Sequence, residues 1–425
     1  MCSFVIVFFI SLLACKFKQD GSVIALFLFV LPLHYFLKQI CFWTGEIGLF
    51  PVWRESILII LLFRCRKHYH LPINRYYLTL VALIIINTIP YFLVSYQTLE
   101  RAIGDLRDSI TVFVFFFLCS SVCFSLSDIK RIFISQVLVY SFLVFSGILQ
   151  MFVMSAPIHL FMGHYDLNGF DFLTNSYTIM GFERMCGFSV GPNIFGVCLA
   201  IFELCIIIHG INMKVKYRIW NKKILLLSAF FLIAILFTFC RTAWAILVGA
   251  IVIVSLMLRK RINLLKFIVT GSISLLLILY ITSFMSESVS EVIVSTFSGK
   301  EDSSADRTNN VSYAWDVVFS SPGGHGVSSG IVFDDFVTES GWAIYAYEVG
   351  VLGLILFLFT FFFILIHIYK MKRYAFVTIG FPICLVSMLA AYPSLGPMYM
   401  PENYMIWGLL GLAVNKSFCA SYERL

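Results

Sequence analysis

The chain has 425 residues, of which 60% are hydrophobic and only 12% are charged. No soluble domain could bury that much apolar surface, so the composition excludes a soluble enzyme and indicates a polytopic membrane protein. The formal net charge is +7. The basic residues are scattered over short loops and form no single face, which argues against a nucleic-acid-binding protein.

The apolar runs are continuous rather than alternating, which predicts helices rather than the strands of a membrane barrel. We predict an all-α protein with about 12 or 13 transmembrane helices in a single membrane domain, residues 1–425. The predicted spans are 2–15, 21–37, 50–63, 76–95, 109–125, 130–153, 190–210, 223–239, 242–258, 263–284, 341–369, 374–392 and 403–415.

Basic residues cluster in alternate loops, and the positive-inside rule therefore places these loops in the cytoplasm. The clusters are Lys16/Lys18, Arg64 to Lys67, Lys130/Arg131, Lys214 to Lys223, Arg259 to Arg261 and Lys370 to Arg373. The remaining loops are then external, and the two largest are insertions at 154–189 and 286–340. The smaller external loops lie near 38–50, 96–108 and 393–402.

The chain contains 12 cysteines, and most of them lie inside predicted spans. No CxxC pair is present, so we interpret the cysteines as small apolar residues and expect no metal and no cofactor.

The first insertion ends in the stretch GFERMCGFSVGPNIFGVCLAIFE, residues 181–203. Pro192 follows Gly191 and suits the first turn of a helix, whose N-terminus would point outward and favour anions. Arg184 lies just upstream and could bind such an anion. The alternative is a flexible loop whose arginine reaches the lipid headgroups.

The stretch FTFCRTAW, residues 237–244, joins two spans almost without a linker and carries Arg241 at the external boundary. This arginine could reach toward headgroups. An arginine on the external side is nevertheless unusual, which favours a functional role.

The second insertion contains DRTNNVSYAWDVVFSSPGGHGVSSG, residues 306–330. Residues 307–319 are expected to form a short amphipathic helix that carries Arg307 and Trp315. His325 lies in the glycine-rich turn that follows. It could act as a base or ligand, or it could be an ordinary surface residue of the turn.

The stretch TESGWAIYAYEVGVLGLILF, residues 338–357, begins with Glu339. On a helix, Ala343, Ala346 and Gly350 fall on the same face as Glu339, while Glu348 falls on the opposite face. Such a stripe of small residues allows tight helix packing. It also leaves room for a lipid-linked substrate beside the Glu339 carboxylate.

Three arginines and a carboxylate are thus expected on the external side. Arginines bind phosphates through paired hydrogen bonds, and a carboxylate can take the proton of a sugar hydroxyl. The chain resembles the O-antigen polymerases (Wzy) and the related O-antigen ligases in four short motifs and in the order of these motifs along residues 184 to 357. The motifs are RMCGFSVGPNIFG, CRTA, DRTNN…W…SPGGHG and ESGWAIYAYEVGVLGL.

The resemblance implies a metal-independent glycosyltransferase of the GT-C type in a bacterial inner membrane. Its partners would be membrane lipids, an undecaprenyl-pyrophosphate-linked oligosaccharide donor and acceptor on the periplasmic face, and, as a further candidate, a protein that regulates chain length. By motif, the family's arginines map onto Arg184, Arg241 and Arg307. Asn193, Trp315 and His325 are further candidate substrate-binding residues.

One departure from the family concerns its histidine. Ligases carry a His-Asn pair nine residues before an acidic residue, and here that position reads Glu339-Ser340 ahead of Glu348. A carboxylate in place of the histidine favours a polymerase with Glu339 as the base.

The alternative functions are a ligase and a lipid-linked sugar flippase or other transporter. A transporter should carry charges along the membrane midplane, where Glu203 is the one clear acid.

Overall fold

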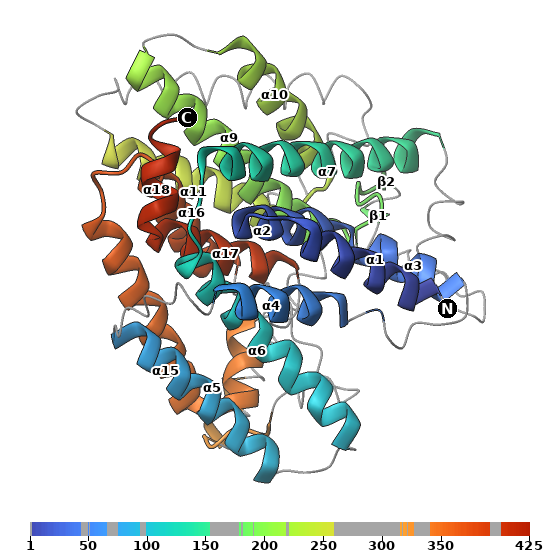
Figure 1. Cartoon of the computed structure of the whole chain (residues 1–425), viewed down its shortest axis with the longest axis vertical. Coiled ribbons are helices and arrows are strands. Elements are labelled where there is room, and N and C mark those ends of the chain that lie inside the picture. The colour runs from blue at the N-terminus through green and yellow to red at the C-terminus, as the bar shows by residue number, and fades with distance from the viewer. Residues whose placement is uncertain are drawn as a thin grey trace. The chain divides into compact units, whose positions relative to one another are not determined.

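The structure is a computed structural model that describes residues 2–43, 50, 52–65, 75–93, 99–153, 178–179, 182–189, 191–217, 221–258, 315–316, 318–320, 322–326, 341–391 and 401–425. These residues are helical apart from turns and one short hairpin (Figure 1). In that hairpin β1 (Thr178–Ile179) pairs antiparallel with β2 (Phe182–Glu183).

The helices follow the apolar runs of the sequence. Their bounds are α1 Cys2–Lys16, α2 Asp20–Val30, η1 Leu31–Leu33, α3 His34–Trp43, α4 Val52–Cys65, α5 Arg75–Leu93, α6 Leu99–Ser121, α7 Leu126–Phe152, α9 Pro192–Tyr217, α10 Lys222–Phe237, α11 Arg241–Met257, α15 Gly341–Lys370, α16 Val377–Val386, η3 Ser387–Ala391, α17 Pro401–Val414 and α18 Lys416–Tyr422.

Each predicted span overlaps helical residues except 263–284, which lies outside the described residues. The span 21–37 covers α2, η1 and the start of α3, and 374–392 covers α16 and η3. The prediction of a loop near 38–50 is wrong up to Trp43, because α3 continues to that residue. The prediction of a loop over 96–108 is wrong from Leu99 onward, because α6 begins there. The residues that extend it include Leu, Glu, Arg and Ala, which favour helix, so the helix continues past the apolar run. Over 21–37 the helix is interrupted by the single 3₁₀ turn η1, which contains Pro32.

Within the described residues, four helical segments are long and apolar enough to cross a membrane: Asp20–Cys41, Leu126–Phe152, Pro192–Tyr217 and Gly341–Lys370. Shorter apolar helices accompany them, among them Arg241–Met257. The chain is therefore a helical membrane protein, and the full number of 12 or 13 spans stays a prediction.

Large apolar side chains also lie on the surface in rows that follow single helices. On α15 alone they include Leu352, Ile355, Phe359, Phe362, Phe363 and Ile366, and Leu226 on α10 is 75% exposed. A soluble monomer rarely exposes apolar patches of this kind to water, whereas in a membrane lipid chains cover them without a cost in free energy.

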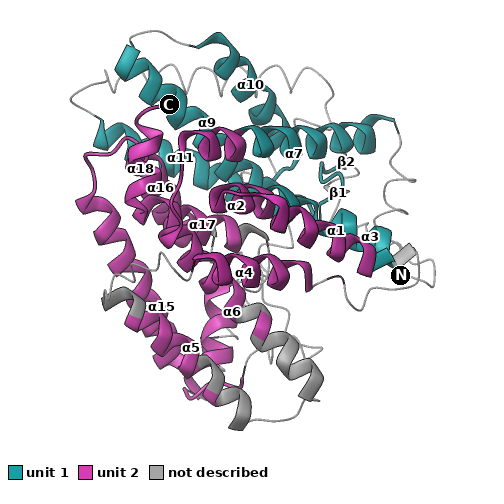
Figure 2. Ribbon diagram, viewed as in Figure 1, with its two compact units in different colours: residues 1–3, 29–47, 134–301 teal, residues 4–28, 48–133, 302–425 magenta. Residues whose placement is uncertain are grey.

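The chain divides into two compact units (Figure 2). The first contains residues 1–3, 29–47 and 134–301, and the second contains residues 4–28, 48–133 and 302–425. The prediction of one membrane domain is not tested by this division, since helices such as α7 run through both sets of residues.

In the second unit, α17 packs closely on α6 because glycines face it. A Cβ at Gly408 would lie 2.7 Å from the Phe115 ring, and a Cβ at Gly411 would lie 2.6 Å from that of Cys119. Such small residues let two helix backbones approach. Asn415 then fixes the end of α17, because its amide donates to the carbonyls of Cys119 at 2.9 Å and Val122 at 2.7 Å.

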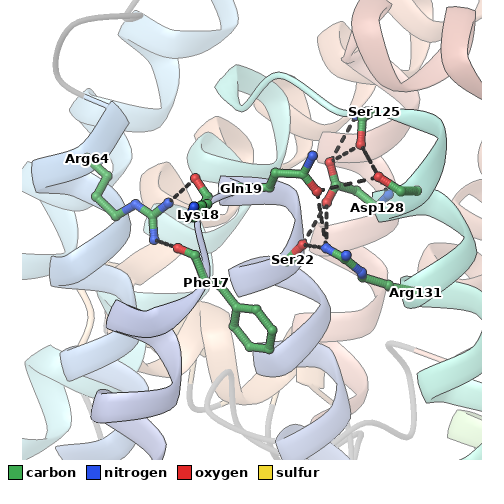
Figure 3. A network of polar contacts seen from close by, with 9 residues as sticks. Phe17, Lys18, Gln19, Ser22, Arg64, Ser125, Asp128 and Arg131 are labelled. Atoms are coloured by element: carbon green, nitrogen blue, oxygen red, sulfur yellow. Dashed lines mark hydrogen bonds and ion pairs between the residues drawn. The ribbon is translucent and has the colours of Figure 1, made fainter.

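A polar network at the turn between α1 and α2 also belongs to the second unit (Figure 3). Arg64 donates to the carbonyls of Phe17 at 2.6 Å and Lys18 at 2.7 Å. Asp128, 1% exposed, accepts a bond from Ser22 at 2.8 Å and caps the start of α7 through Ser125. These bonds satisfy carbonyls of the turn that follows α1 and tie this turn to α4 and α7.

Helix α15 is broken at Gly350, which has φ 76° and ψ 170°. The turn at 322–326 inserts there. His325 N–H donates to the Tyr347 carbonyl and Gly326 N–H to the Glu348 carbonyl, both at 2.9 Å, while Val351 N–H donates to the Pro322 carbonyl at 3.0 Å. The backbone groups that the break releases are thus bonded within the protein, as a membrane interior requires.

We expect Gly350→Ala to lower the free energy of unfolding by about 2–4 kcal/mol, because this φ/ψ region is open almost only to glycine. The new Cβ would also lie 2.5 Å from the Pro322 carbonyl oxygen. Thermal unfolding of the purified protein in detergent measures the change. Gly323→Ala in the same turn is the matched control, because a Cβ there meets nothing within 4 Å. Equal stability of the two variants would contradict this account.

Candidate functional site

The site is built where the loop before α9 meets the turn between α10 and α11, all within the first unit. Helix α9 begins at Pro192, as predicted from the Gly-Pro pair. Proline fits the first turn because no intrahelical hydrogen bond is lost there.

The turn from α10 to α11 is as short as predicted, since α10 ends at Phe237 and α11 begins at Arg241. Thr238 closes α10, with its hydroxyl donating to the Ile235 carbonyl at 2.7 Å. Phe239 has φ 49°, the one positive φ of a non-glycine residue in the described chain. A bulky residue holds this conformation only when its surroundings fix it.

Arg184 is the residue that fixes this turn. Its side chain is buried, with 7% exposed, and its Nε donates to the Thr238 carbonyl at 2.9 Å. One terminal nitrogen donates to the Asn193 side-chain oxygen at 2.6 Å and lies 3.5 Å from the Phe239 carbonyl. The guanidinium therefore caps the C-terminal end of α10, where free carbonyls and the helix dipole favour a cation.

The loop that carries Arg184 is held in turn by Gln150 of α7, which is 0% exposed. The Gln150 amide nitrogen donates to Glu183 Oε1 at 2.6 Å and to the Arg184 carbonyl at 3.1 Å. Its oxygen accepts from the N–H groups of Cys186 at 3.0 Å and Gly187 at 2.7 Å. The sequence did not predict Gln150 as a site residue. No local sequence pattern connects it with the loop at 183–187, which it contacts only in the folded chain.

The first turns of α9 and α11 are in contact at this place. The two helices pack together, and a Cβ on Gly196 would lie 2.6 Å from the Cβ of Cys240. The Cys240 thiol also lies 3.5 Å from the Asn193 carbonyl. Two positive helix ends thus converge, with half-buried Arg241 as the first residue of α11. Such an arrangement favours a phosphate or another anion.

The Cys186 thiol lies beside this loop and donates to Gln150 at 3.4 Å. Burial, reinforced by the nearby Glu183 carboxylate, raises the pKa of Cys186 well above its usual range. The thiol therefore stays neutral and is a poor nucleophile. Among the residues that the structure describes, no group of three His, Cys, Asp or Glu side chains could hold a metal ion.

The other predicted site residues belong to the second unit or are not described. The His325 ring stacks on the Tyr347 ring, with centroids 4.1 Å apart and planes at 10°. Trp315 stacks on Phe319 at 5.8 Å within the predicted amphipathic helix, of which only the last residues are described. Arg307 and Glu339 lie outside the described residues.

The stripe expected to follow Glu339 is changed by the break in α15. Ala343 and Ala346 are fully buried, but Gly350 departs from helical geometry, so the face predicted for one continuous helix ends before it. Glu348 is buried, with 8% exposed.

Arg54 is a further candidate that the sequence interpretation missed. It lies in the first turn of α4 with 4% of its surface exposed, and its guanidinium carbon is 5.8 Å from the centre of the Tyr404 ring. Nearby, Arg107 and Glu55 form an ion pair at 3.4 Å. The sequence could have indicated this residue, because Arg54, like Arg241, lies at the external end of a predicted span, where an arginine is unusual.

Glu203, the mid-depth acid of α9, is fully buried against α10. One carboxyl oxygen accepts a hydrogen bond from Ser228, and the other has no partner among the described residues. No charged group of the described chain pairs with it in the structure, so it does not form the row of midplane charges expected of a transporter.

We expect Gln150→Leu to lower the free energy of unfolding by about 2–4 kcal/mol, because it leaves the buried N–H groups of Cys186 and Gly187 without an acceptor. Thermal unfolding in detergent is the measurement. Glu183→Gln is the control, since its amide oxygen can still accept from Gln150. A Gln150→Leu protein as stable as this control would show that the loop does not depend on Gln150.

Comparison with known proteins adds no relative. No family model matches the chain, and neither a curated protein nor a solved structure matches it. The function must therefore be inferred from the residues of the chain and their arrangement.

Proposed function

We propose that the chain is an O-antigen polymerase, a glycosyltransferase that joins oligosaccharide repeat units carried on undecaprenyl pyrophosphate. The observation that carries the proposal is the convergence of two helix N-termini at Arg241, with Arg184 hydrogen-bonded to the turn that precedes it. Such a site suits a pyrophosphate, and the motifs that form it are those that resemble the polymerase family.

In the proposed reaction, a hydroxyl of the acceptor unit attacks the anomeric carbon of the donor glycan. The new C–O bond forms as the bond from the anomeric carbon to the phosphate oxygen breaks, and undecaprenyl pyrophosphate leaves. Glu339 accepts the proton of the attacking hydroxyl. Arg241 and the helix ends stabilise the negative charge on the leaving pyrophosphate, so no strong acid is needed. One direct displacement inverts the anomeric centre.

Arg184 has a different role in this proposal from the one expected from the sequence alone. Its Nε and one terminal nitrogen are bonded to Thr238 and Asn193, so it acts mainly by fixing the turn that presents Arg241. Arg307 and His325 remain candidates for contacts with the sugars. The remaining parts of the proposal are a GT-C type fold, a place in the bacterial inner membrane, a site facing the periplasm, and a chain-length regulator as partner.

A break like that in α15 also occurs in transporters, where the released backbone groups bind ions. Here the carbonyls of Tyr347 and Glu348 accept bonds from the turn at 322–326 instead. This argues against a flippase. The ligase alternative differs in the acceptor, which would be lipid A–core.

The test is the lipopolysaccharide of a strain that lacks the gene. A lost polymerase with an intact ligase should leave lipid A–core carrying a single repeat unit, without a ladder of longer chains. Bare core would indicate a ligase instead, and an unchanged ladder would contradict both enzymatic functions. Restoring the gene should restore the ladder.

A further inference from the structure

The second half of α15 carries its exposed apolar side chains on one face, because successive residues of a helix turn by about 100°. These side chains, which we call the α15 stripe, are between 40% and 55% exposed and belong to Phe359, Phe362, Phe363 and Ile366. The side chains on the opposite face are buried, and they are Phe361, Ile364, Leu365 and Ile368. This part of α15 therefore packs on the protein with one face and offers the other to lipid chains.

The α15 stripe ends at a lysine. Lys370 is exposed and follows Ile366 by four residues, so it lies on the same face of the helix. At a rise of 1.5 Å per residue, the distance along the helix from Phe359 to Lys370 is about 16 Å. This is about half the thickness of the hydrocarbon core of a bilayer. The stripe and the ammonium group that follows it thus match the length and the order of a phospholipid in one leaflet, with its acyl chains first and its phosphate after them.

Lys372 is held at the same end of the stripe. Its ammonium group lies 5.4 Å from the centre of the Tyr369 ring, which is 47% exposed. Tyrosines of this kind are typical of the boundary between membrane and water. Arg373 differs, because its guanidinium lies 4.8 Å from the centre of the Tyr374 ring and donates to the Tyr374 hydroxyl at 3.0 Å.

Helix α18 brings two further cations to this part of the second unit. Two of its aromatic rings pack on Phe376, at centroid distances of 4.7 Å and 5.2 Å, which holds α18 against the turn that follows α15. The exposed cations at its two ends are Lys416 and Arg424. Glu423 is the one acidic side chain of residues 369–376 and 415–425, and it accepts a hydrogen bond from the Ala375 N–H. Cations therefore outnumber acidic side chains here, which favours a negatively charged ligand.

We propose that this end of α15 binds an anionic phospholipid. Its phosphate contacts Lys370 and Lys372, its acyl chains cover the α15 stripe, and Lys416 and Arg424 add to the attraction. Clusters of four or more cations next to a membrane helix are typical of proteins that bind anionic lipids. A zwitterionic lipid carries a cationic group of its own, which the lysines repel. None of these residues takes part in the reaction proposed above, so the lipid site is independent of it.

A phosphatidylglycerol with a photoreactive diazirine on one acyl chain tests the site on the full-length protein, purified in detergent. We expect illumination at limiting lipid concentration to label α15 within residues 359–366, and a phosphatidylcholine with the same chains to label it much less. Lys370→Ala/Lys372→Ala should lower labelling by phosphatidylglycerol about 10- to 30-fold, because each cation near the headgroup contributes about fivefold in affinity. Salt at 1 M should remove the difference between the two lipids, because it screens the charges.

Arg373→Ala is the matched control, because it removes a cation of the same turn that is bonded to Tyr374. It should be labelled like the wild type. Equal labelling by the two lipids, or undiminished labelling of Lys370→Ala/Lys372→Ala, would overturn the site. A loss in Arg373→Ala as large as in the double variant would also overturn it, because the lipid would then respond only to total charge. Complete competition by glycerol 3-phosphate would show a phosphate site that does not depend on acyl chains, and would overturn the lipid.

Discussion

Arg241→Ala should abolish the ladder of O-antigen chains while the protein still reaches the membrane at its normal level. Arg241 stands at the first position of α11, where the positive ends of α9 and α11 meet. Losing a charged donor to phosphate should cost about 2–4 kcal/mol of transition-state stabilisation, or about 30- to 1000-fold in rate. Lysine should restore activity only in part, because it cannot bind a phosphate through two parallel bonds.

The chain offers controls for this substitution. Arg373→Ala removes an exposed arginine from a predicted cytoplasmic loop and should leave the ladder unchanged. Arg184→Ala should differ in kind, because it removes the bonds to Thr238 and Asn193 and so lowers both the melting temperature and the activity. A full ladder in cells with normal amounts of Arg241→Ala protein would show that this arginine only reaches toward headgroups.

Glu339→Gln should reduce polymerisation by about 10²- to 10⁴-fold, because glutamine keeps the shape of the side chain and removes its basicity. The cell should then attach single repeat units to lipid A–core, visible as one band above the core on a lipopolysaccharide gel. This expectation rests on sequence, since Glu339 lies just ahead of the described part of α15.

Asp316→Asn is the matched control, because Asp316 is an exposed acid of the same predicted external insertion. It should leave the ladder unchanged. An undiminished ladder in Glu339→Gln would remove this carboxylate from the chemistry, whereas bare core would indicate that the lost reaction is ligation.

Local features of the sequence were enough to predict most of the described helices, the start of α9 and the short turn from α10 to α11. Pro192 after Gly191 marks the start of α9, and the absence of a linker before Arg241 marks the turn from α10 to α11. Both signals lie within a few neighbouring residues. The structure agrees with these two predictions because proline geometry and helix termination depend mainly on neighbouring residues.

Features that depend on distant contacts could not be predicted. Gly350 in an apolar run is typical of close helix packing, and its break in α15 becomes visible only with the turn at 322–326 inserted beside it. The role of Arg184 likewise depends on Thr238 and Gln150, which lie far from it in the sequence. A sequence pattern that predicts arginines on one side of a membrane does not show with which groups each arginine forms hydrogen bonds.

Polymerisation by the purified protein tests the central claim most directly. The protein, reconstituted in lipid vesicles, would be supplied with its host's repeat units on undecaprenyl pyrophosphate and no other protein. We expect lipid-linked chains of two, three and more units to accumulate with time, and Arg241→Ala protein to leave the single units unchanged. Single units that stay unchanged with the wild-type protein, or that move only when lipid A–core is added, would contradict a polymerase.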